Sequence, residues 1–187
     1  MKVFISGGCK NGKSFYAQHL AKAAAADGLG DALPLYYVAT MKPVDAEDDE
    51  RIYRHRAERE GWGFTTVEQP VRIEEILRKC DHGGSFLLDS QTALLANEMF
   101  PTGGDVDFEA GKRIIDGLTC VLEKIERIVI VSDYIYSDAI IYDRLTELYR
   151  KSLAEIDCAV AGSCDVVLEV AFSGVTVHKG EITVDYV

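Results

Sequence analysis

Residues Val3-Phe4-Ile5-Ser6-Gly7-Gly8-Cys9-Lys10-Asn11-Gly12-Lys13-Ser14 form a short apolar run that leads directly into a glycine-rich turn. From Gly7 onward the stretch fits the phosphate-loop pattern G-x-x-x-x-G-K-[ST]. Glycines let the backbone turn several N–H groups toward one point, and the helix that follows adds the positive end of its dipole there. The stretch therefore predicts a strand, a loop that binds polyphosphate, and a helix, in that order.

Every residue of this loop is a candidate nucleotide ligand: Gly7, Gly8, Cys9, Lys10, Asn11, Gly12, Lys13 and Ser14. In such a loop the Lys13 ammonium lies along the β- and γ-phosphate oxygens, and the Ser14 hydroxyl binds the Mg²⁺ that bridges them. Lys13 is therefore also a candidate catalytic residue, and Ser14 a candidate metal ligand.

The composition is that of a globular protein of ordinary size, with 187 residues, 48% hydrophobic and 27% charged. A chain of this length buries about 70% of the surface that its unfolded form exposes, so we expect a single domain over residues 1–187. No apolar run approaches the length of a membrane span. The loop begins at residue 7 and leaves no room for a cleavable leader, so the cytoplasm is the expected location.

Charge and cysteine usage exclude several classes of partner. The net charge of −11 disfavours nucleic acid and anionic membrane surfaces, so a polyanionic ligand needs local positive charge. The five cysteines are scattered and contain no C-x-x-C pair, which indicates reduced, mostly buried thiols rather than a disulfide framework or a zinc site.

Strand and helix patterns alternate along the chain. After the first strand, strands are expected at 35–39, 64–68, 85–89, 127–132 and 165–170, and helices at about 13–27, 45–60, 71–79, 91–100, 107–125 and 141–161. This alternation predicts a three-layer α/β fold with a mostly parallel sheet of the P-loop NTPase type. Residues 175–177 and 182–184 flank a polar turn and predict a C-terminal antiparallel hairpin.

Within the 45–60 helix, Arg51, His55 and Arg59 follow at intervals of four and share one helix face. An imidazole between two guanidiniums is biased toward its neutral, nucleophilic form, and the guanidiniums can neutralise phosphate oxygens. The alternative is a solvated amphipathic helix whose arginines pair with neighbouring glutamates. Spacing alone leaves both readings open.

Two acids end buried strands. Asp89 fits the carboxylate that holds Mg²⁺ through its water shell in phosphate-loop enzymes, and helix capping is the alternative. Asp133 is a weaker candidate of the same kind. Arg144, Arg150 and Lys151 can reach phosphates or serve as surface charges, and Trp62 can stack on a ring or pack in the core.

Taken together, the chain resembles the bifunctional adenosylcobinamide kinase/adenosylcobinamide-phosphate guanylyltransferase family of cobalamin biosynthesis, from residue 3 to about 179. The residues that carry the resemblance are the phosphate loop, Tyr37-Val38-Ala39-Thr40, Arg51-Ile52-Tyr53-Arg54-His55-Arg56, Trp62, Thr66-Val67-Glu68, Leu87-Leu88-Asp89-Ser90-Gln91-Thr92, Asn97, Arg144-Leu145 and Arg150.

The resemblance implies a two-step enzyme. ATP or GTP phosphorylates adenosylcobinamide, and GMP from GTP is then transferred to that phosphate with loss of pyrophosphate. It implies that His55 carries the GMP covalently, that Arg51 and Arg59 stabilise charge on the α-phosphate, and that Lys13, Ser14, Mg²⁺ and Asp89 manage the leaving group. It also implies a trimer with active sites at subunit contacts.

The chain departs from the family pattern in two places. Residues 132–141 contain neither Gly nor Pro where the family commonly has a glycine-rich Asn-Glu-Val-Gly segment followed by Pro. Lys10-Asn11 stands where Arg-Ser is usual. Two alternative functions stay open: a small-molecule P-loop kinase without guanylyl transfer, and a nucleotide-binding regulatory module without catalysis.

Overall fold

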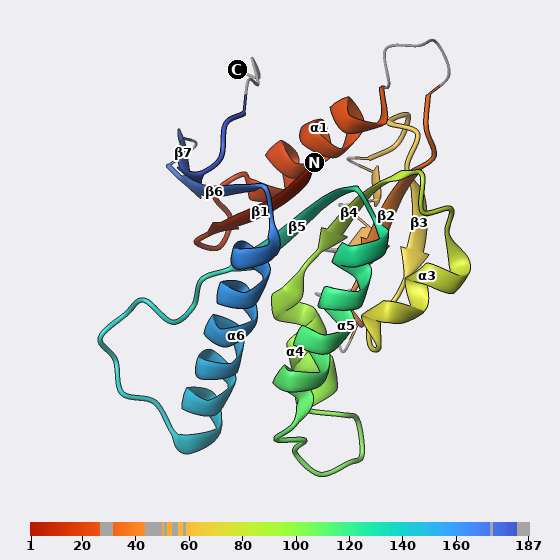
Figure 1. Ribbon diagram of the computed structural model, residues 1–187. Coiled ribbons are helices and arrows are strands. Elements are labelled where there is room, and N and C mark those ends of the chain that lie inside the picture. The colour runs from red at the N-terminus through yellow and green to blue at the C-terminus, as the bar shows by residue number, and fades with distance from the viewer. Residues whose placement is uncertain are drawn as a thin grey trace.

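The computed structural model describes residues 1–26, 32–43, 50, 52–53, 56–57, 59–172 and 174–182. Within them a seven-stranded sheet runs in the order β3-β2-β4-β5-β1-β6-β7 (Figure 1). Neighbouring strands from β3 to β6 are parallel, and β7 is antiparallel to β6. The predicted mostly parallel α/β fold with a C-terminal antiparallel hairpin is confirmed.

The strands are β1 (Lys2–Gly7), β2 (Leu35–Ala39), β3 (Thr65–Glu68), β4 (Ser85–Asp89), β5 (Arg127–Asp133), β6 (Val166–Ala171) and β7 (Gly174–Lys179). The helices are α1 (Lys13–Ala25), the 3₁₀ turn η1 (Ile73–Glu75), α3 (Ile76–Lys79), α4 (Gln91–Met99), α5 (Ala110–Lys124) and α6 (Arg144–Ser163). None of the helices in this described part of the chain combines the length and apolar character needed to cross a membrane.

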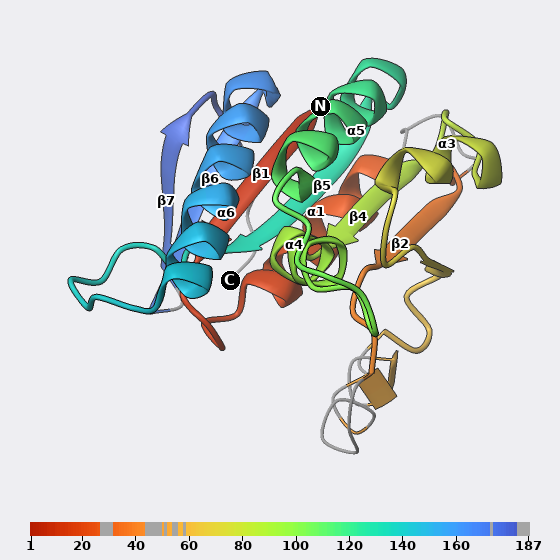
Figure 2. The same ribbon diagram turned by 90° about the horizontal axis from the view of Figure 1, so that it is seen from below.

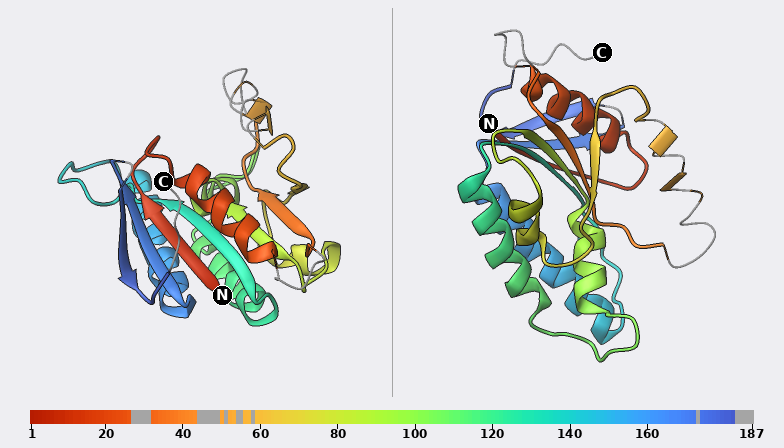
Figure 3. Two further views of the ribbon diagram at one scale, coloured as in Figure 1. Left: turned by 90° about the horizontal axis from the view of Figure 1, so that it is seen from above. Right: turned by 90° about the vertical axis from the view of Figure 1, so that its right-hand side faces the viewer.

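Helices cover both faces of the sheet and make three layers (Figure 3). The helix α1 lies on one face, and α4, α5 and α6 lie side by side across the other (Figure 2). Alternation along β1 serves both layers, since Val3 and Ile5 pack with α1 while Phe4 packs in the opposite core. A parallel strand that is covered on both faces has a continuous apolar sequence, and for this reason β1 could be predicted from the sequence.

Local signals set the helix ends. The Asp143 carboxylate accepts hydrogen bonds from the backbone N–H groups of Leu145 at 2.9 Å and Thr146 at 3.2 Å, so α6 begins at Arg144, three residues later than predicted. Ser90 caps α4 in the same way, accepting from Ala93 N–H at 3.4 Å. The predicted 71–79 helix is shorter, because Arg72 has a φ of 50° and the helical turns start only at Ile73.

The hairpin uses different residues from those expected. The strand β7 starts at Gly174 and pairs with β6, so His178 and Lys179 lie in a strand and not in the turn. Every residue of β7 is exposed, which removes the burial that would have marked its bounds, and Gly180 with a φ of 75° follows its end. Residues 183–184 of the predicted partner strand lie outside the described residues.

The prediction of mostly buried cysteines was wrong. Cys9, Cys120 and Cys158 are exposed, Cys80 is half-buried and only Cys164 is buried. The exposed positions lie in the phosphate loop and on the outer faces of α5 and α6, where a small thiol needs no core partner.

Because β1, β2, β4 and β5 are parallel, their carboxyl ends meet at one edge of the sheet. Ligands of open α/β sheets bind outside this edge. The phosphate loop, Thr40, Asp89 and Asp133 all lie at these strand ends.

Candidate functional site

The phosphate loop has a backbone that only certain residues can adopt. A Cβ on Gly7 would lie 2.3 Å from the Val170 carbonyl oxygen, so the close approach of β1 to β6 requires glycine there. Gly12, just before α1, has a φ of 93°, in the left-handed region that favours glycine. The Asn11 amide donates a hydrogen bond to the Val170 carbonyl oxygen and so ties the loop to β6.

The Lys13 side chain is folded into this loop and only 5% of the residue is exposed. Its Nζ donates to the Gly8 carbonyl oxygen at 2.6 Å, to Asn11 Oδ1 at 3.3 Å and to Asp133 Oδ1 at 2.6 Å. An ammonium has three N–H donors, so this set matches its full capacity. Ser14 follows as the second residue of α1 and is half-buried. Cys9 and Lys10 lie exposed at the tip of the loop.

Asp133 is held at the loop by its own backbone. It ends β5 directly opposite Gly7 of β1, and its N–H donates to the Thr92 hydroxyl at 3.0 Å. The next N–H, that of Tyr134, donates to the Gly7 carbonyl oxygen at 3.3 Å. The sequence singled out Asp133 only as a strand-end acid, and its pairing with Lys13 was visible only once the strand order was known.

Asp89 lies in a second cluster at the same edge. Its Oδ2 accepts a hydrogen bond from the Tyr37 hydroxyl at 2.9 Å, and the Arg59 guanidinium lies over the Tyr37 ring with its Cζ 3.5 Å from the centroid. Arg59 is only 7% exposed, so the reading of this arginine as a solvated helix charge was wrong. Sequence reasoning placed Tyr37 only in a strand and in the family pattern, and missed its contact with Asp89. The available signal was a tyrosine on a buried strand, whose hydroxyl needs a partner.

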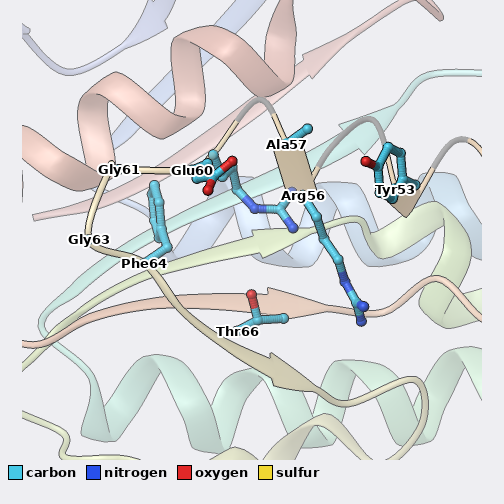
Figure 4. Close-up of a pocket in the computed structure, with 9 residues that line it drawn as sticks. Tyr53, Arg56, Ala57, Glu60, Gly61, Gly63, Phe64 and Thr66 are labelled. Atoms are coloured by element: carbon cyan, nitrogen blue, oxygen red, sulfur yellow. The ribbon is translucent and has the colours of Figure 1, made fainter.

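Arg59 also lines a pocket of about 760 Å³ next to β3. Figure 4 shows Arg56 and Ala57 across from Thr66, with Gly61, Gly63 and Phe64 closing one end. Arg56 pairs with Glu68 at 2.6 Å. The predicted nucleophile His55 and the predicted ligand Arg51 lie outside the described residues.

Polar side chains around Asp89 bond to neighbouring backbone groups and so have a structural role at this sheet edge. The Thr40 hydroxyl accepts from Ser90 N–H at 2.8 Å and donates to the Ser90 carbonyl oxygen at 2.7 Å. The Asn97 amide donates to the carbonyl oxygens of Thr40 at 2.7 Å and Pro70 at 3.1 Å. The Ser90 bonds hold the end of β2 to the start of α4, and the Asn97 bonds hold the segments after β2 and β3 to the last turn of α4.

The residues present fit a magnesium ion better than a transition metal. The described residues contain no group of three or more His, Cys, Asp or Glu side chains that could hold a metal. Mg²⁺ commonly takes one or two protein oxygens and completes its shell with water and substrate phosphate. The hydroxyl of Ser14 and the carboxylate of Asp133 supply oxygens of that kind at the loop, and Asp89 supplies one at the same sheet edge.

A buried carboxyl group lies on the opposite face of the same strand ends. Asp157 of α6 is 3% exposed and accepts hydrogen bonds from Gln91 Nε2 at 2.6 Å and the Tyr136 hydroxyl at 2.9 Å. Burial is the main cause that raises the pKa of Asp157 from its ordinary 3.8 to about 6. The nearby charge of Asp133 contributes to this rise, and the hydrogen bonds from Tyr136 and Gln91 offset part of it. Gln91 is therefore a structural residue.

Arg150 is not a surface charge, although the sequence left that reading open. It is 7% exposed, and its guanidinium donates to the carbonyl oxygens of Ile135 at 3.0 Å and Ile140 at 3.4 Å. It also pairs with Asp138 at 3.0 Å and Glu147 at 2.8 Å. Arg150 thus fixes the segment between β5 and α6. Arg144 and Lys151 are exposed.

Trp62 is half-buried and belongs to an aromatic cluster on α1. Its ring lies 4.7 Å from that of His19 and 6.3 Å from that of Phe15, and the Lys22 ammonium lies 5.1 Å from the ring centroid. Phe15, next to Ser14, is 65% exposed.

A family model described as cobinamide kinase / cobinamide phosphate guanyltransferase matches residues 3–178. The chain belongs to this family. Its match covers the phosphate loop, Asp89, Asp133 and Arg150, so the resemblance seen in the sequence is confirmed.

Two curated members of the CobU family give the scale of the similarity. The bifunctional adenosylcobalamin biosynthesis protein CobU of Escherichia coli is 32% identical over 109 residues, which are 57% of this chain and 55% of that protein. The protein of the same description from Salmonella typhimurium is 25% identical over 178 residues, or 89% of this chain and 93% of that one. The chain thus aligns with about half of the first relative and nearly all of the second.

A crystal structure of a KaiC-like protein from Pyrococcus horikoshii is similar in fold. It covers 96% of this chain and 78% of that one, with a TM-score of 0.52 and 13% sequence identity. At that identity the likeness supports the P-loop fold of this CobU family member and nothing about its substrate.

Proposed function

We propose that this chain phosphorylates adenosylcobinamide with ATP or GTP and then transfers GMP from GTP to adenosylcobinamide phosphate, giving adenosyl-GDP-cobinamide. The observation that carries the proposal is the Lys13 ammonium, enclosed in a phosphate loop at the sheet edge, in a chain that matches the family over residues 3–178.

In the phosphorylation step, the acceptor hydroxyl attacks the γ-phosphorus and the nucleoside diphosphate leaves. The loop amides and Lys13 bind the β- and γ-phosphate oxygens, where negative charge shifts during transfer. Ser14 and Asp89 are the residues that would hold a Mg²⁺ ion, which would supply charge neutralisation for the phosphates when bound.

In the guanylyl step, an imidazole nitrogen of His55 attacks the α-phosphorus of GTP. The bond to the β-phosphate oxygen breaks, pyrophosphate leaves, and GMP is held through a P–N bond. The acceptor phosphate oxygen then attacks the same phosphorus and the P–N bond breaks, which regenerates the imidazole. Arg51 and Arg59 stabilise charge on the α-phosphate oxygens.

Intact-mass measurement after incubation with GTP and Mg²⁺ tests this chemistry. We expect one added GMP that is stable to alkali, labile to acid and lost in His55→Gln. His82→Gln is the matched control, because His82 is an exposed histidine far along the chain, with its ring against the Leu77 carbonyl oxygen.

The remaining outcomes separate the alternatives. ATP-dependent phosphorylation of a cobinamide without a covalent adduct would make the chain a P-loop kinase alone. Nucleotide binding without turnover of any cobinamide would make it a regulatory module. We further propose a cytoplasmic homo-oligomer, a trimer by family resemblance, which sedimentation of the purified protein checks.

A further inference from the structure

We propose that Asp133 is a positioning residue that holds Lys13 until nucleotide displaces it, and that this exchange makes the loop select Mg²⁺-bound over free nucleotide. The inference deepens the proposed function and rests on its nucleotide site. It starts from the 2.6 Å ion pair between the Lys13 ammonium and the Asp133 carboxylate.

Lys13 has no spare donor for a phosphate. Its three N–H groups are matched by the Gly8 carbonyl oxygen, Asn11 Oδ1 and Asp133 Oδ1. A phosphate oxygen that takes a hydrogen bond from Lys13 must replace one of these acceptors. The Asp133 carboxylate is the charged one, and like charge between it and the phosphate disfavours their sharing one ammonium.

The backbone of Asp133 stays in place when its carboxylate loses Lys13. Its N–H is bonded to the Thr92 hydroxyl at 3.0 Å, and the following residue is bonded to the Gly7 carbonyl oxygen at 3.3 Å. Strand pairing places Asp133 opposite Gly7, the first residue of the phosphate loop. Because an aspartate side chain is short, the freed carboxylate stays near the loop that now holds a polyphosphate.

Two anionic groups held at one site need a cation. Free nucleotide leaves the Asp133 carboxylate without a counter-charge, whereas nucleotide bound with Mg²⁺ supplies one, directly or through the water shell of the ion. Asp133 thus penalises the free form more than the metal-bound form. It also lies in the segment 132–141, where this chain departs from the family pattern.

Calorimetric titration with α,β-methylene GTP, without a cobinamide, tests the exchange, because the bridge blocks attack at the α-phosphorus. We expect wild-type protein to bind the analogue far more tightly with Mg²⁺ than with EDTA. In Asp133→Asn the ratio of the two dissociation constants should fall by at least about tenfold, mainly because the free analogue binds more tightly. Asp133→Glu, which keeps the charge, should retain the preference.

Asp105→Asn is the matched control, since it removes the same charge from an exposed loop after α4. A wild-type protein that binds the analogue equally well with and without Mg²⁺ would overturn the inference, whatever the variants do. An unchanged ratio in a folded Asp133→Asn protein would overturn it too. Failure of wild-type protein to bind the analogue at all would instead overturn the proposed function, and this inference with it.

Discussion

Two nearly buried ionisable groups lie on opposite faces of the same strand ends, and they are held differently. Lys13, on the α1 face, has the Asp133 carboxylate among its partners. Asp157, on the α6 face, is bonded to the neutral groups of Gln91 and Tyr136. A counter-charge keeps a buried group ionised, whereas neutral partners leave it to be neutralised by a proton as its pKa rises. The first face is therefore suited to binding charge and the second to avoiding it.

The largest effect that we expect comes from removing the paired charge. Lys13→Met should lower kcat/KM of both transfers by about a thousandfold, the scale measured when one preorganised donor to a developing charge is lost. Steady-state kinetics with each nucleotide measures it. Lys112→Met, on the exposed side of α5, should leave both rates within twofold (about 0.4 kcal/mol). If Lys112→Met lowered the rates as much as Lys13→Met, the effect would not be specific to the phosphate-loop lysine.

The Asp157 carboxyl, which has no positively charged partner among the described residues, predicts that stability falls as pH rises. Because the folded state binds a proton at Asp157 more tightly than the unfolded chain, this group stabilises the fold at acidic pH and loses that contribution as pH rises from about 4 through 6. Asp157→Asn should therefore gain stability relative to wild type at pH 7.5 compared with pH 4.5, by about 2 kcal/mol.

Urea unfolding of both proteins at the two pH values measures this difference. The exposed Asp116→Asn on α5 controls for the loss of one negative charge. A constant difference between wild type and Asp157→Asn across that pH range would show that the carboxyl is not raised in pKa.

The smallest effect concerns the strand end that both faces share. In Gly7→Ala the new Cβ would lie 2.3 Å from the Val170 carbonyl oxygen and 2.5 Å from Asn11 Nδ2, so we expect a loss of about 2 kcal/mol of unfolding free energy. Gly8→Ala meets no atom within 4 Å and should change stability by less than about 0.5 kcal/mol. Thermal unfolding of the two variants side by side would contradict the steric argument if both melt alike.

Much of the fold could be predicted because its strands are buried on both faces. Continuous apolar runs that end at polar residues marked β2, β4 and β5 to within a residue. The exposed strand β7 carries no such run, and its bounds were misplaced for that reason. The left-handed backbone at Arg72 has no sequence signal, so the short turn η1 was read as a longer helix.

The site was predictable only where a motif spans consecutive residues. The phosphate loop is such a motif, and its residues lie close together because they are consecutive in the chain. The pairing of Lys13 with Asp133 joins residues 120 positions apart and depends on β5 lying next to β1, which periodicity cannot give. The same holds for the contact between Arg59 and Tyr37, which needs the end of the 45–60 segment to lie over β2.

The manner in which Arg150 holds the segment between β5 and α6 bears on how this region can diverge. Two of its hydrogen bonds go to main-chain oxygens, those of Ile135 and Ile140, which any residue provides. The side chains at the outer turn, such as Ile141 with 93% of its surface exposed, are therefore free to be exchanged while the backbone path is kept. Because Arg150 holds this segment through its main chain, the side chains of the segment can be varied without disturbing the phosphate loop.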